Sequence, residues 1–258
     1  MEKADPNWWK TLFDEIYLIT DARSVCDQAL TRQEVDFLEQ ILKLEKSWPI
    51  LDLCGGQGRH SLELSRRGFQ DVTVVDYSAV LIDLGRQLAA QEGLKTLFLR
   101  KDARHTGLPA QRFRAIIIMA SSFGYFLDEG ENERILDEAF RLLSRDGLLL
   151  LDLPNRDYVL KNFLPLSWHE ANHEIVVCRQ RRRDENVLHC RELVISKTEG
   201  MIRDARYCTR LYSPEKITEM LASAGFAGVT VRTNFVSHRI DGDYGIMMNR
   251  MIVTARKD

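Results

Sequence analysis

A regular alternation of short apolar runs with helical patterns most limits the fold of this chain. The apolar runs lie at residues 50–53, 72–75, 96–99, 115–119 and 148–153. Buried parallel strands are apolar on both faces and need helical crossovers, so this alternation is typical of a parallel sheet covered on both sides. Two further strands are expected near 229–234 and 247–255. We therefore predict an α/β fold with a doubly wound, mostly parallel, seven-stranded sheet.

The N-terminal part predicts two helices that precede the sheet. Residues 7–20 indicate one amphipathic helix, because apolar side chains recur there at helical spacing. Its apolar face consists of Trp9, Leu12, Phe13 and Ile16. Thr31 and Glu34 form a capping-box pair, in which each side chain hydrogen-bonds a backbone N–H of the other. A second helix is therefore predicted to begin at Thr31.

The pattern changes after Pro154, where the helical stripes stop. Residues 166–211 read as three or four strands with alternating polarity, which predicts a small antiparallel β insert. Ser213-Pro214 then starts a helix, with serine as N-cap and proline at the first helical position. Residues 1–165 are expected to hold N-terminal lid helices and the first part of the α/β domain. The insert, 166–211, is expected to form a substrate lobe, and 212–258 to complete the domain.

The loop after the first strand is rich in glycine and follows a carboxylate. It reads Ile50-Leu51-Asp52-Leu53-Cys54-Gly55-Gly56-Gln57-Gly58. Because glycine has no Cβ, the backbone N–H groups of such a turn at a helix start can approach a ligand closely. A plain structural turn is the alternative. Asp52 favours a cationic ligand, since a carboxylate would repel the pyrophosphate of a dinucleotide.

Two more carboxylates follow at the ends of the next two strands. Asp76 lies 20 positions after Gly56, where a carboxylate can accept from two ribose hydroxyls. Asp102 ends the third strand and is placed to meet an adenine amino group. The carboxyl ends of parallel strands share one edge, so the three acids are predicted to form one rim. A nicotinamide dehydrogenase would lack the first acid and would usually have a glycine in place of Ser61.

With this rim, the chain resembles the class I S-adenosylmethionine-dependent methyltransferases, strongly over 35–155 and also over 210–258. In that family the loop usually runs Asp-x-Gly-x-Gly-x-Gly, and Cys54 stands where the first glycine is usual. The resemblance implies S-adenosylmethionine as cofactor and S-adenosylhomocysteine as its product. It implies cofactor contacts from Asp52, Cys54, Gly55, Gly56, Gly58, Asp76, Tyr77, Asp102, Ala103, Met119, Ala120 and Ser121.

The layout is also similar to that of small-molecule methyltransferases with an N-terminal helical lid and an antiparallel insert after the fifth strand. This resemblance implies that the lid and the loop after the fourth strand border the methyl acceptor. The acceptor contacts that it implies are Trp9, Tyr17, Phe123, Tyr125 and Arg156. The loop lacks the Asn/Asp-Pro-Pro-Tyr/Phe string of nucleobase amino-methyltransferases. A small-molecule acceptor is therefore expected.

The reaction predicted from these residues is methyl transfer by in-line displacement to an N or O nucleophile, catalysed largely by positioning. A catalytically silent S-adenosylmethionine-binding module and, with less support, an NAD-dependent dehydrogenase are the alternatives. A base is needed only when the acceptor must lose a proton. Its candidates are Tyr17, His60, Tyr125 and His169, and the sequence singles out none of them.

Two other motifs carry competing interpretations. His169-Glu170-Ala171-Asn172-His173 matches the H-E-x-x-H string of zinc proteases, which requires a helix. Pro165 and the strand-like residues 174–178 predict no helix here, so no metal site is expected. A cluster of arginines alternates along a predicted strand and is followed by acids, which favours a solvated face or internal ion pairs. Its members are Arg179, Arg181, Arg182 and Arg183.

Composition limits the partners. The formal net charge of −2 argues against a dedicated nucleic-acid or membrane-surface binder. No apolar run approaches the ~20 residues of a membrane span, and the first residues show no signal-peptide pattern. The five cysteines include no C-x-x-C pair, as is typical of reduced thiols. A cytoplasmic protein is expected, and its oligomeric state is left open.

Overall fold

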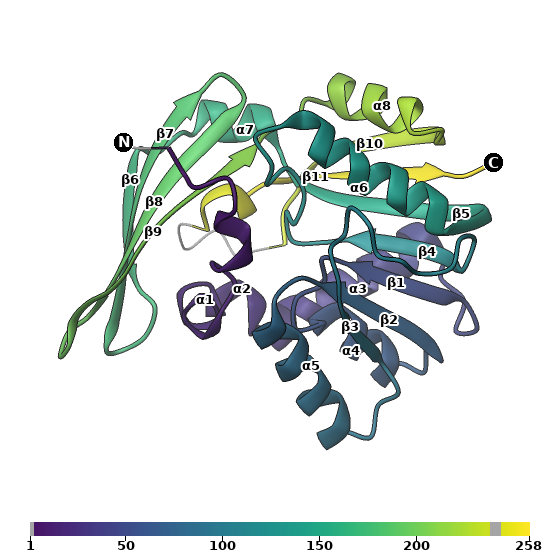
Figure 1. Ribbon diagram of the computed structural model, residues 1–258, viewed down its shortest axis with the longest axis horizontal. Helices are drawn as coiled ribbons and strands as arrows, with labels where there is room; N and C mark the ends of the chain where they lie inside the picture. Colours follow the sequence, from purple (N-terminus) through teal and green to yellow (C-terminus); the bar gives the residue numbers. More distant parts are fainter. Residues whose placement is uncertain (1–2, 238–243) are drawn as a thin grey trace.

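A seven-stranded sheet forms the centre of the structure, a computed structural model that describes residues 3–237 and 244–258 (Figure 1). Its strand order is β10-β11-β5-β4-β1-β2-β3. The strands are β1 (Pro49–Leu53), β2 (Asp71–Asp76), β3 (Leu97–Arg100), β4 (Phe113–Ile118), β5 (Leu143–Pro154), β10 (Ala227–Phe235) and β11 (Arg250–Arg256). β1 to β5 pair in parallel, whereas β11 runs antiparallel between β5 and β10. The predicted mostly parallel sheet is confirmed.

The strand order reverses between β1 and β4, and this reversal places the site. β1 pairs with β2 on one side and with β4 on the other. The chain therefore leaves the carboxyl ends of β1 and β4 in opposite directions along the sheet. A crevice opens at such a switch point, and ligands of doubly wound folds bind there.

Helices cover both faces of this sheet. They are α3 (Gln28–Leu42), α4 (Arg59–Arg66), α5 (Ala79–Gln91), α6 (Glu129–Leu142) and α8 (Pro214–Ser223). Alternate strand residues point to opposite faces, so Ile50 packs in the core with α3 and Leu51 in the core with α6 and α8. The Ser213 hydroxyl caps α8, as the sequence predicts.

The N-terminal segment (residues 3–26) is not one helix, so the prediction of a single helix over 7–20 is wrong. The segment forms a short 3-10 helix η1 (Trp8–Lys10), then α1 (Glu15–Thr20) and α2 (Ala22–Val25). Asp14 has extended backbone, and its carboxylate accepts from the N–H groups of Ile16 (2.9 Å) and Tyr17 (3.1 Å). Asp14 is therefore an N-cap that starts a new helix, although it reads as a polar-face residue in the sequence.

The next helix begins earlier than predicted. α3 starts at Gln28, and the Asp27 carboxylate accepts from the N–H groups of Ala29 and Leu30. The Thr31 hydroxyl donates to the Asp27 carbonyl instead of capping a helix, and Glu34 is fully buried. The predicted capping box is wrong because Asp27 already satisfies the first turn.

A separate four-stranded antiparallel sheet confirms the predicted insert. Its order is β6-β7-β8-β9, with β6 (Leu166–Glu170), β7 (Ile175–Asp184), β8 (Val187–Ser196) and β9 (Gly200–Arg210). The short helices α7 (Arg156–Lys161) and η2 (Gly245–Met247) were not predicted. Figure 1 shows the N-terminal segment between the two sheets. In the described part of the chain, no helix is long and apolar enough to cross a membrane.

Candidate functional site

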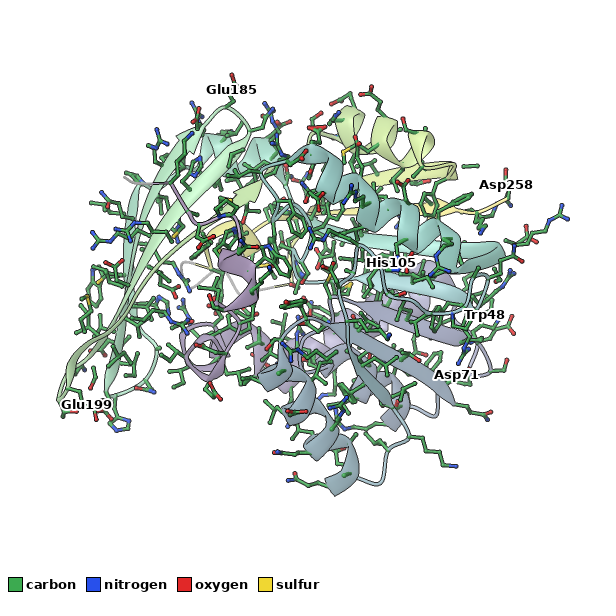
Figure 2. The ribbon with its side chains drawn as sticks, viewed as in Figure 1. Trp48, Asp71, His105, Glu185, Glu199 and Asp258 are labelled. Atoms are coloured by element: carbon green, nitrogen blue, oxygen red, sulfur yellow. The ribbon has the colours of Figure 1, made fainter. Side chains whose placement is uncertain are left out.

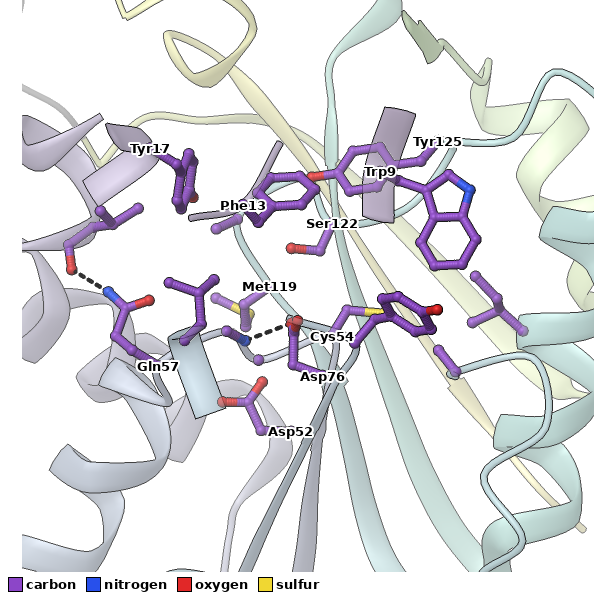
Figure 3. Close-up of a pocket in the computed structure, with 18 of the residues that line it drawn as sticks. Trp9, Phe13, Tyr17, Asp52, Cys54, Gln57, Asp76, Met119, Ser122 and Tyr125 are labelled. Atoms are coloured by element: carbon purple, nitrogen blue, oxygen red, sulfur yellow. Dashed lines mark hydrogen bonds between the residues drawn. The ribbon is translucent and has the colours of Figure 1, made fainter. Parts of the chain in front are cut away.

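Two adjoining cavities lie between the carboxyl ends of the central strands, the N-terminal segment and the insert. We call them the first cavity and the second cavity. The first is bordered by the glycine loop, the ends of β2 and β3, and the loop after β4 (Figure 3). Most residues predicted to contact a cofactor lie on its wall. They are Asp52, Cys54, Gly55, Gly56, Asp76, Tyr77, Asp102, Ala103, Met119 and Ala120.

The glycine loop is fixed by hydrogen bonds to the neighbouring strand. The Gly55 N–H donates to the Val75 carbonyl (3.2 Å), and the Gly56 N–H donates to the Asp76 carboxylate (2.8 Å). Gly58 has a φ of +73°, and a Cβ there would lie 2.6 Å from the Phe98 ring. Gly58 does not line either cavity, so its predicted cofactor contact is not supported. Its lack of a side chain lets the loop pack on β3 instead.

Cys54 adopts the left-handed backbone conformation that favours glycine, with a φ of +62°. The loop therefore keeps the geometry of a glycine at this position, at a cost of about 1–2 kcal/mol in strain. Burial raises the pKa of the Cys54 thiol well above its ordinary value, and nearby Asp76 raises it further. The thiol is thus neutral, which argues against a nucleophilic role.

Asp52 is a fully buried carboxylate with one unpartnered oxygen. Its Oδ2 accepts from the Ser61 hydroxyl (2.8 Å), whereas Oδ1 has no hydrogen-bond partner among the described residues. A Cβ on Gly55 would lie 2.5 Å from the Asp52 Cγ, so the carboxylate can lie against the loop only because position 55 is glycine. Burial raises the pKa of Asp52 to about 7. A cationic group in the first cavity would partner this oxygen and favour the ionised form, so the residues fit the ammonium of S-adenosylmethionine.

Asp76 and Asp102 lie at the neighbouring strand ends, as predicted. Besides the Gly56 N–H, the Asp76 carboxylate accepts from the Ser78 N–H (2.9 Å), which fixes its orientation. The Asp102 carboxylate accepts from Nε (2.9 Å) and Nη2 (2.6 Å) of Arg104. Burial raises the pKa of Asp102, but these hydrogen bonds more than offset burial and hold the pKa below its ordinary value. Asp102 therefore stays ionised.

Aromatic side chains of the N-terminal segment cover the first cavity. The ring of Trp9 packs edge-on against Tyr77 (4.7 Å between centroids), and Phe13 stacks on Tyr125 (5.6 Å). The Ser78 hydroxyl donates to the Phe13 carbonyl (2.6 Å), which ties the segment to the start of α5. Figure 3 shows Trp9, Phe13, Tyr17 and Tyr125 across the cavity from the glycine loop.

The second cavity continues from the first towards the insert. Phe13, Tyr17, Val25, Ala120 and Tyr125 line both cavities. The other walls come from the N-terminal segment, β7, β8, β9 and residues 244–247. Their polar and aromatic members include Trp8, Asp21, Ser24, Ser121, Arg179, Arg181, Glu192, Tyr207 and Thr209. A molecule bound there would lie next to the contents of the first cavity.

Ion pairs join the N-terminal segment to the insert around the second cavity. Arg179 donates through Nη2 to Asp21 (2.8 Å) and through Nε to Glu192 (2.7 Å). Arg203 of β9 pairs with Asp14. The internal ion pairs expected for the arginine cluster therefore exist at Arg179. They balance the charge in the cavity wall and fasten the segment in place.

None of the four predicted base candidates combines a suitable position with a suitable pKa. Burial raises the pKa of both phenols, Tyr17 and Tyr125, above its ordinary value, so they stay protonated at neutral pH. Nε2 of His60 lies 2.9 Å from the Glu34 carboxylate, and burial lowers the pKa of His60 to about 4. His169 hydrogen-bonds the Thr20 carbonyl (3.2 Å) and lines neither cavity.

Besides Gly58, three predicted site residues lie elsewhere than expected: Phe123, Arg156 and Ser121. Phe123 is fully buried in the core beside Tyr212 (5.5 Å between ring centroids), and Arg156 of α7 donates to Asn186 (2.8 Å). Neither lines the first or the second cavity, so the cavity walls do not support their predicted acceptor contacts. Ser121 lines the second cavity, not the first. Ala120 and Ser121 both have positive φ, and the resulting turn in the backbone places Ser121 at the second cavity instead of the first.

The H-E-x-x-H string does not form a zinc-protease site. His169 and Glu170 end strand β6, and residues 171–174 are outside any helix or strand. The two histidines therefore do not share a helix face.

A network of buried charges beneath the loop after β4 was not predicted. Glu34, Asp152 and Arg250 come from α3, β5 and β11, and each is 0% exposed. Arg250 donates to both carboxylates. No local pattern signals such a network, because its members meet only after the sheet has formed.

Several residues of the first cavity were also missed: Val25, Gln57, Leu81, Lys101, Ser122, Gly124, Phe126 and Ile135. Gln57 and Lys101 stand inside or beside the predicted motifs, so a wider reading of those motifs would have found them. The Gln57 amide donates to the Val25 carbonyl (2.9 Å), a contact between distant segments that sequence spacing does not indicate.

Comparison with known proteins gives consistent relatives. A family described as "Methyltransferase domain" matches residues 50–147. The chain is 26% identical to the putative methyltransferase YqeM of Bacillus subtilis (strain 168), over 91% of this chain and 95% of that protein. It is 31% identical to a glycine/sarcosine N-methyltransferase of Aphanothece halophytica, over 51% of this chain and only 50% of that enzyme.

The fold resembles that of a solved methyltransferase. A crystal structure of an S-adenosylmethionine-dependent methyltransferase from Clostridium acetobutylicum ATCC 824 superposes with a TM-score of 0.74, covering 94% of this chain and 96% of that one. At 16% identity, this likeness concerns the fold alone. The sequence relatives, the shared fold and a cavity suited to a cationic adenosyl ligand agree with one another. Residues 50–147 thus match a methyltransferase domain family, and the chain has the fold of the S-adenosylmethionine-dependent methyltransferases, with S-adenosylmethionine as the methyl donor that its first cavity fits.

Proposed function

We propose that this methyltransferase acts on a nitrogen nucleophile of a small molecule that binds in the second cavity. The observation that carries this proposal is the wall shared by the two cavities, which includes Phe13, Ala120 and Tyr125. A donor in the first cavity and an acceptor in the second would meet there. Holding the two reactants side by side supplies much of the rate in an in-line displacement. An acceptor cavity also favours an enzyme over a silent binding module.

The cofactor contacts follow from the rim of carboxylates. In this proposal Asp52 Oδ1 accepts from the ammonium, Asp76 accepts from the ribose hydroxyls, and Asp102 accepts from the adenine amino group. Tyr77 and Ala103 border the adenine. Backbone and side-chain contacts come from Cys54, Gly55, Gly56, Met119 and Ala120. The bound cofactor supplies a methyl group that its sulfonium charge already activates.

The choice of nitrogen rests on the absence of a suitable base among the four candidates. The phenols of Tyr17 and Tyr125 stay protonated because burial raises the pKa of each. A neutral amine or ring nitrogen brings its own lone pair and needs no base before attack. Four relatives named as N-methyltransferases of glycine and sarcosine support the same choice. An oxygen nucleophile with a high pKa would need a base.

Two measurements test the proposal. Titration calorimetry with S-adenosylhomocysteine should show binding that Asp76→Ala weakens. Labelled S-adenosylmethionine should then transfer its methyl group to members of a panel of amines, amino acids, aryl amines and phenols. Binding without transfer to any member would favour the silent module. Transfer to phenols alone would overturn the choice of nitrogen.

A further inference from the structure

The loop between the two cavities contains an unusual pair of residues, Ala120 and Ser121. Their φ values are +55° and +59°, although neither is glycine. Such backbone is disfavoured for L residues and persists only where the surroundings hold it. Ala120 lines both cavities and Ser121 lines the second. Strained backbone therefore lies where donor and acceptor would meet.

Asp152 holds this pair. Its Oδ2 accepts from the Ala120 N–H (2.8 Å), and its backbone carbonyl accepts from the Ser121 N–H (3.1 Å). Arg250 donates to the same carboxylate and to Glu34. The N–H groups of Ala120 and Ser121 therefore both donate to Asp152, whose carboxylate is oriented by its ion pair with Arg250.

Stability alone does not account for this network. Replacing a buried ion pair with apolar residues of similar volume is often neutral or stabilising. Glu34 also contacts two residues of the first cavity, Arg59 (2.6 Å) and His60 (2.9 Å). The network thus connects the wall of the first cavity with the loop that divides the two.

The Ser121 hydroxyl has an unmet hydrogen-bonding capacity. Ser121 is 2% exposed, and within 3–237 and 244–258 its Oγ has no hydrogen-bond partner. Most buried side-chain polar atoms are hydrogen-bonded. A polar atom of a molecule in the second cavity would provide the partner.

We propose that Glu34, Arg250 and Asp152 are positioning residues that hold Ala120 and Ser121, and that the Ser121 hydroxyl orients the methyl acceptor. The hydroxyl would accept from an N–H of the acceptor, which leaves the nitrogen lone pair facing the first cavity. This inference rests on the proposed function, because it needs an acceptor in the second cavity.

Ser121→Ala tests the contact, because it removes the hydroxyl but keeps the Cβ and the backbone strain. We expect kcat/KM for the acceptor to fall about 10–100-fold, the usual effect of leaving one buried partner unsatisfied. The Kd of S-adenosylhomocysteine in calorimetry should stay within about twofold. A parallel loss of cofactor affinity would assign the hydroxyl to the first cavity and overturn the inference. An unchanged kcat/KM would overturn it equally.

The positioning role has a spectroscopic test that needs no acceptor. In protein labelled with ¹⁵N-alanine, the Ala120 amide resonance is assigned by its disappearance in Ala120→Ser. Asp152→Asn should move this resonance upfield, because the accepting oxygen loses its charge. Glu34→Gln, which changes a residue without contact to Ala120, should move it in the same direction through Arg250. Asp71→Asn is the matched control, since Asp71 at the start of β2 accepts two hydrogen bonds from the guanidinium of Arg112, which precedes β4 at the opposite end of the strands from Ala120.

The results separate two kinds of failure. If the wild type methylates no acceptor in the panel, the proposed function fails, while the Ala120 resonance still decides the positioning role. If acceptors are methylated but Glu34→Gln leaves the Ala120 resonance unmoved, the positioning role fails alone. Asp152→Asn should also lower turnover more than it raises the Kd of S-adenosylhomocysteine, and equal effects on both would contradict it.

Discussion

Asp52 is the residue whose sequence position best separates a cationic ligand from a dinucleotide. Its surroundings explain why a carboxylate matters at the end of β1. One oxygen is held by Ser61, and the other has no partner in the described chain. Asp76 and Asp102 were predictable for the same reason, because the ends of parallel strands can be read from local patterns. Asp152 and Arg250 were not predictable. They lie on β5 and β11, which are far apart in sequence and become neighbours only when the sheet forms.

Asp52→Asn should weaken the binding of S-adenosylhomocysteine by about 10-fold or more, because a charge-assisted hydrogen bond to the ammonium is lost. The affinity for 5′-methylthioadenosine, which lacks the amino-acid part, should hardly change. Titration calorimetry with both ligands measures the difference. Asp83→Asn is a suitable control, since Asp83 pairs with Arg86 on the exposed side of α5. Equal losses for the two ligands would show that Asp52 acts on the loop and not on the ammonium.

The pKa of Asp52 also predicts how stability depends on pH. Burial raises this pKa from 3.8 to about 7 in the folded protein without ligand, so the folded state binds the proton more tightly than the unfolded state. The contribution to stability is therefore complete below about pH 4 and is lost as the pH rises towards about 7. Urea unfolding across this range should show a shallower fall for Asp52→Asn than for the wild type. Identical slopes would contradict the raised pKa.

Cys54 allows a test of backbone strain. Cys54→Gly and Cys54→Ala both remove the sulfur, but only glycine relieves a φ of +62°. We expect the glycine variant to be more stable than the alanine variant by about 1 kcal/mol, the reverse of the usual order inside helices and strands. Urea unfolding of the two variants measures the difference. An alanine variant of equal or greater stability would show that position 54 relaxes to another conformation.

At the scale of elements, the N-terminal segment departs most from its predicted form. Its aromatic spacing matched a single helix, yet Asp14 divides it into separate turns. The division lets Trp9 pack on Tyr77 while Trp8 packs on Tyr207 of the insert (5.7 Å between ring centroids). Helical periodicity predicts side chains that pack on one continuous surface. It could not indicate that Trp8 and Trp9 pack against two different surfaces. The central strands β1, β2 and β4 were predicted better, because each is buried along most of its length and needs no such division.

Asp14→Ala should speed the release of S-adenosylhomocysteine, because it removes the cap of α1 and the ion pair with Arg203. We expect the dissociation rate to rise by about 10-fold, in line with the loss of one cap and one partly buried pair. Stopped-flow tryptophan fluorescence measures this rate, since Trp8 and Trp9 lie in the segment. Asp204→Asn removes a carboxylate that pairs with Arg191 across β8 and β9, and should leave the rate unchanged. The same acceleration in both variants would point to a general loosening.

At the scale of the whole molecule, the first cavity joins parts of the chain that are far apart in sequence. Side chains fill the space between the central sheet and the insert (Figure 2). A ligand bound in the first cavity should therefore stabilise the fold as a unit. At a free concentration 100 times Kd it adds about 2.7 kcal/mol, which raises Tm by about 5–10 °C for a chain of this size. Thermal unfolding with S-adenosylhomocysteine measures this shift. NADH, the ligand of the dehydrogenase alternative, should give none, and a shift with NADH would reopen that alternative.

The chain leaves β5 and returns in β11 at one point, where Pro154 faces Arg250. Next to this pair, the Asn155 N–H donates to the Asn249 carbonyl (3.1 Å), and the Asn155 side chain donates to that of Asn249 (2.8 Å). The segment between β5 and β11, which includes the insert, therefore begins and ends at hydrogen-bonded neighbours. The glycine loop and its acids come earlier in the chain. For a lineage under selection for new acceptors, residues 166–210 can therefore diverge while the glycine loop and its acids are inherited unchanged, provided that Arg203 keeps the ion pair that holds Asp14 and its segment over the first cavity.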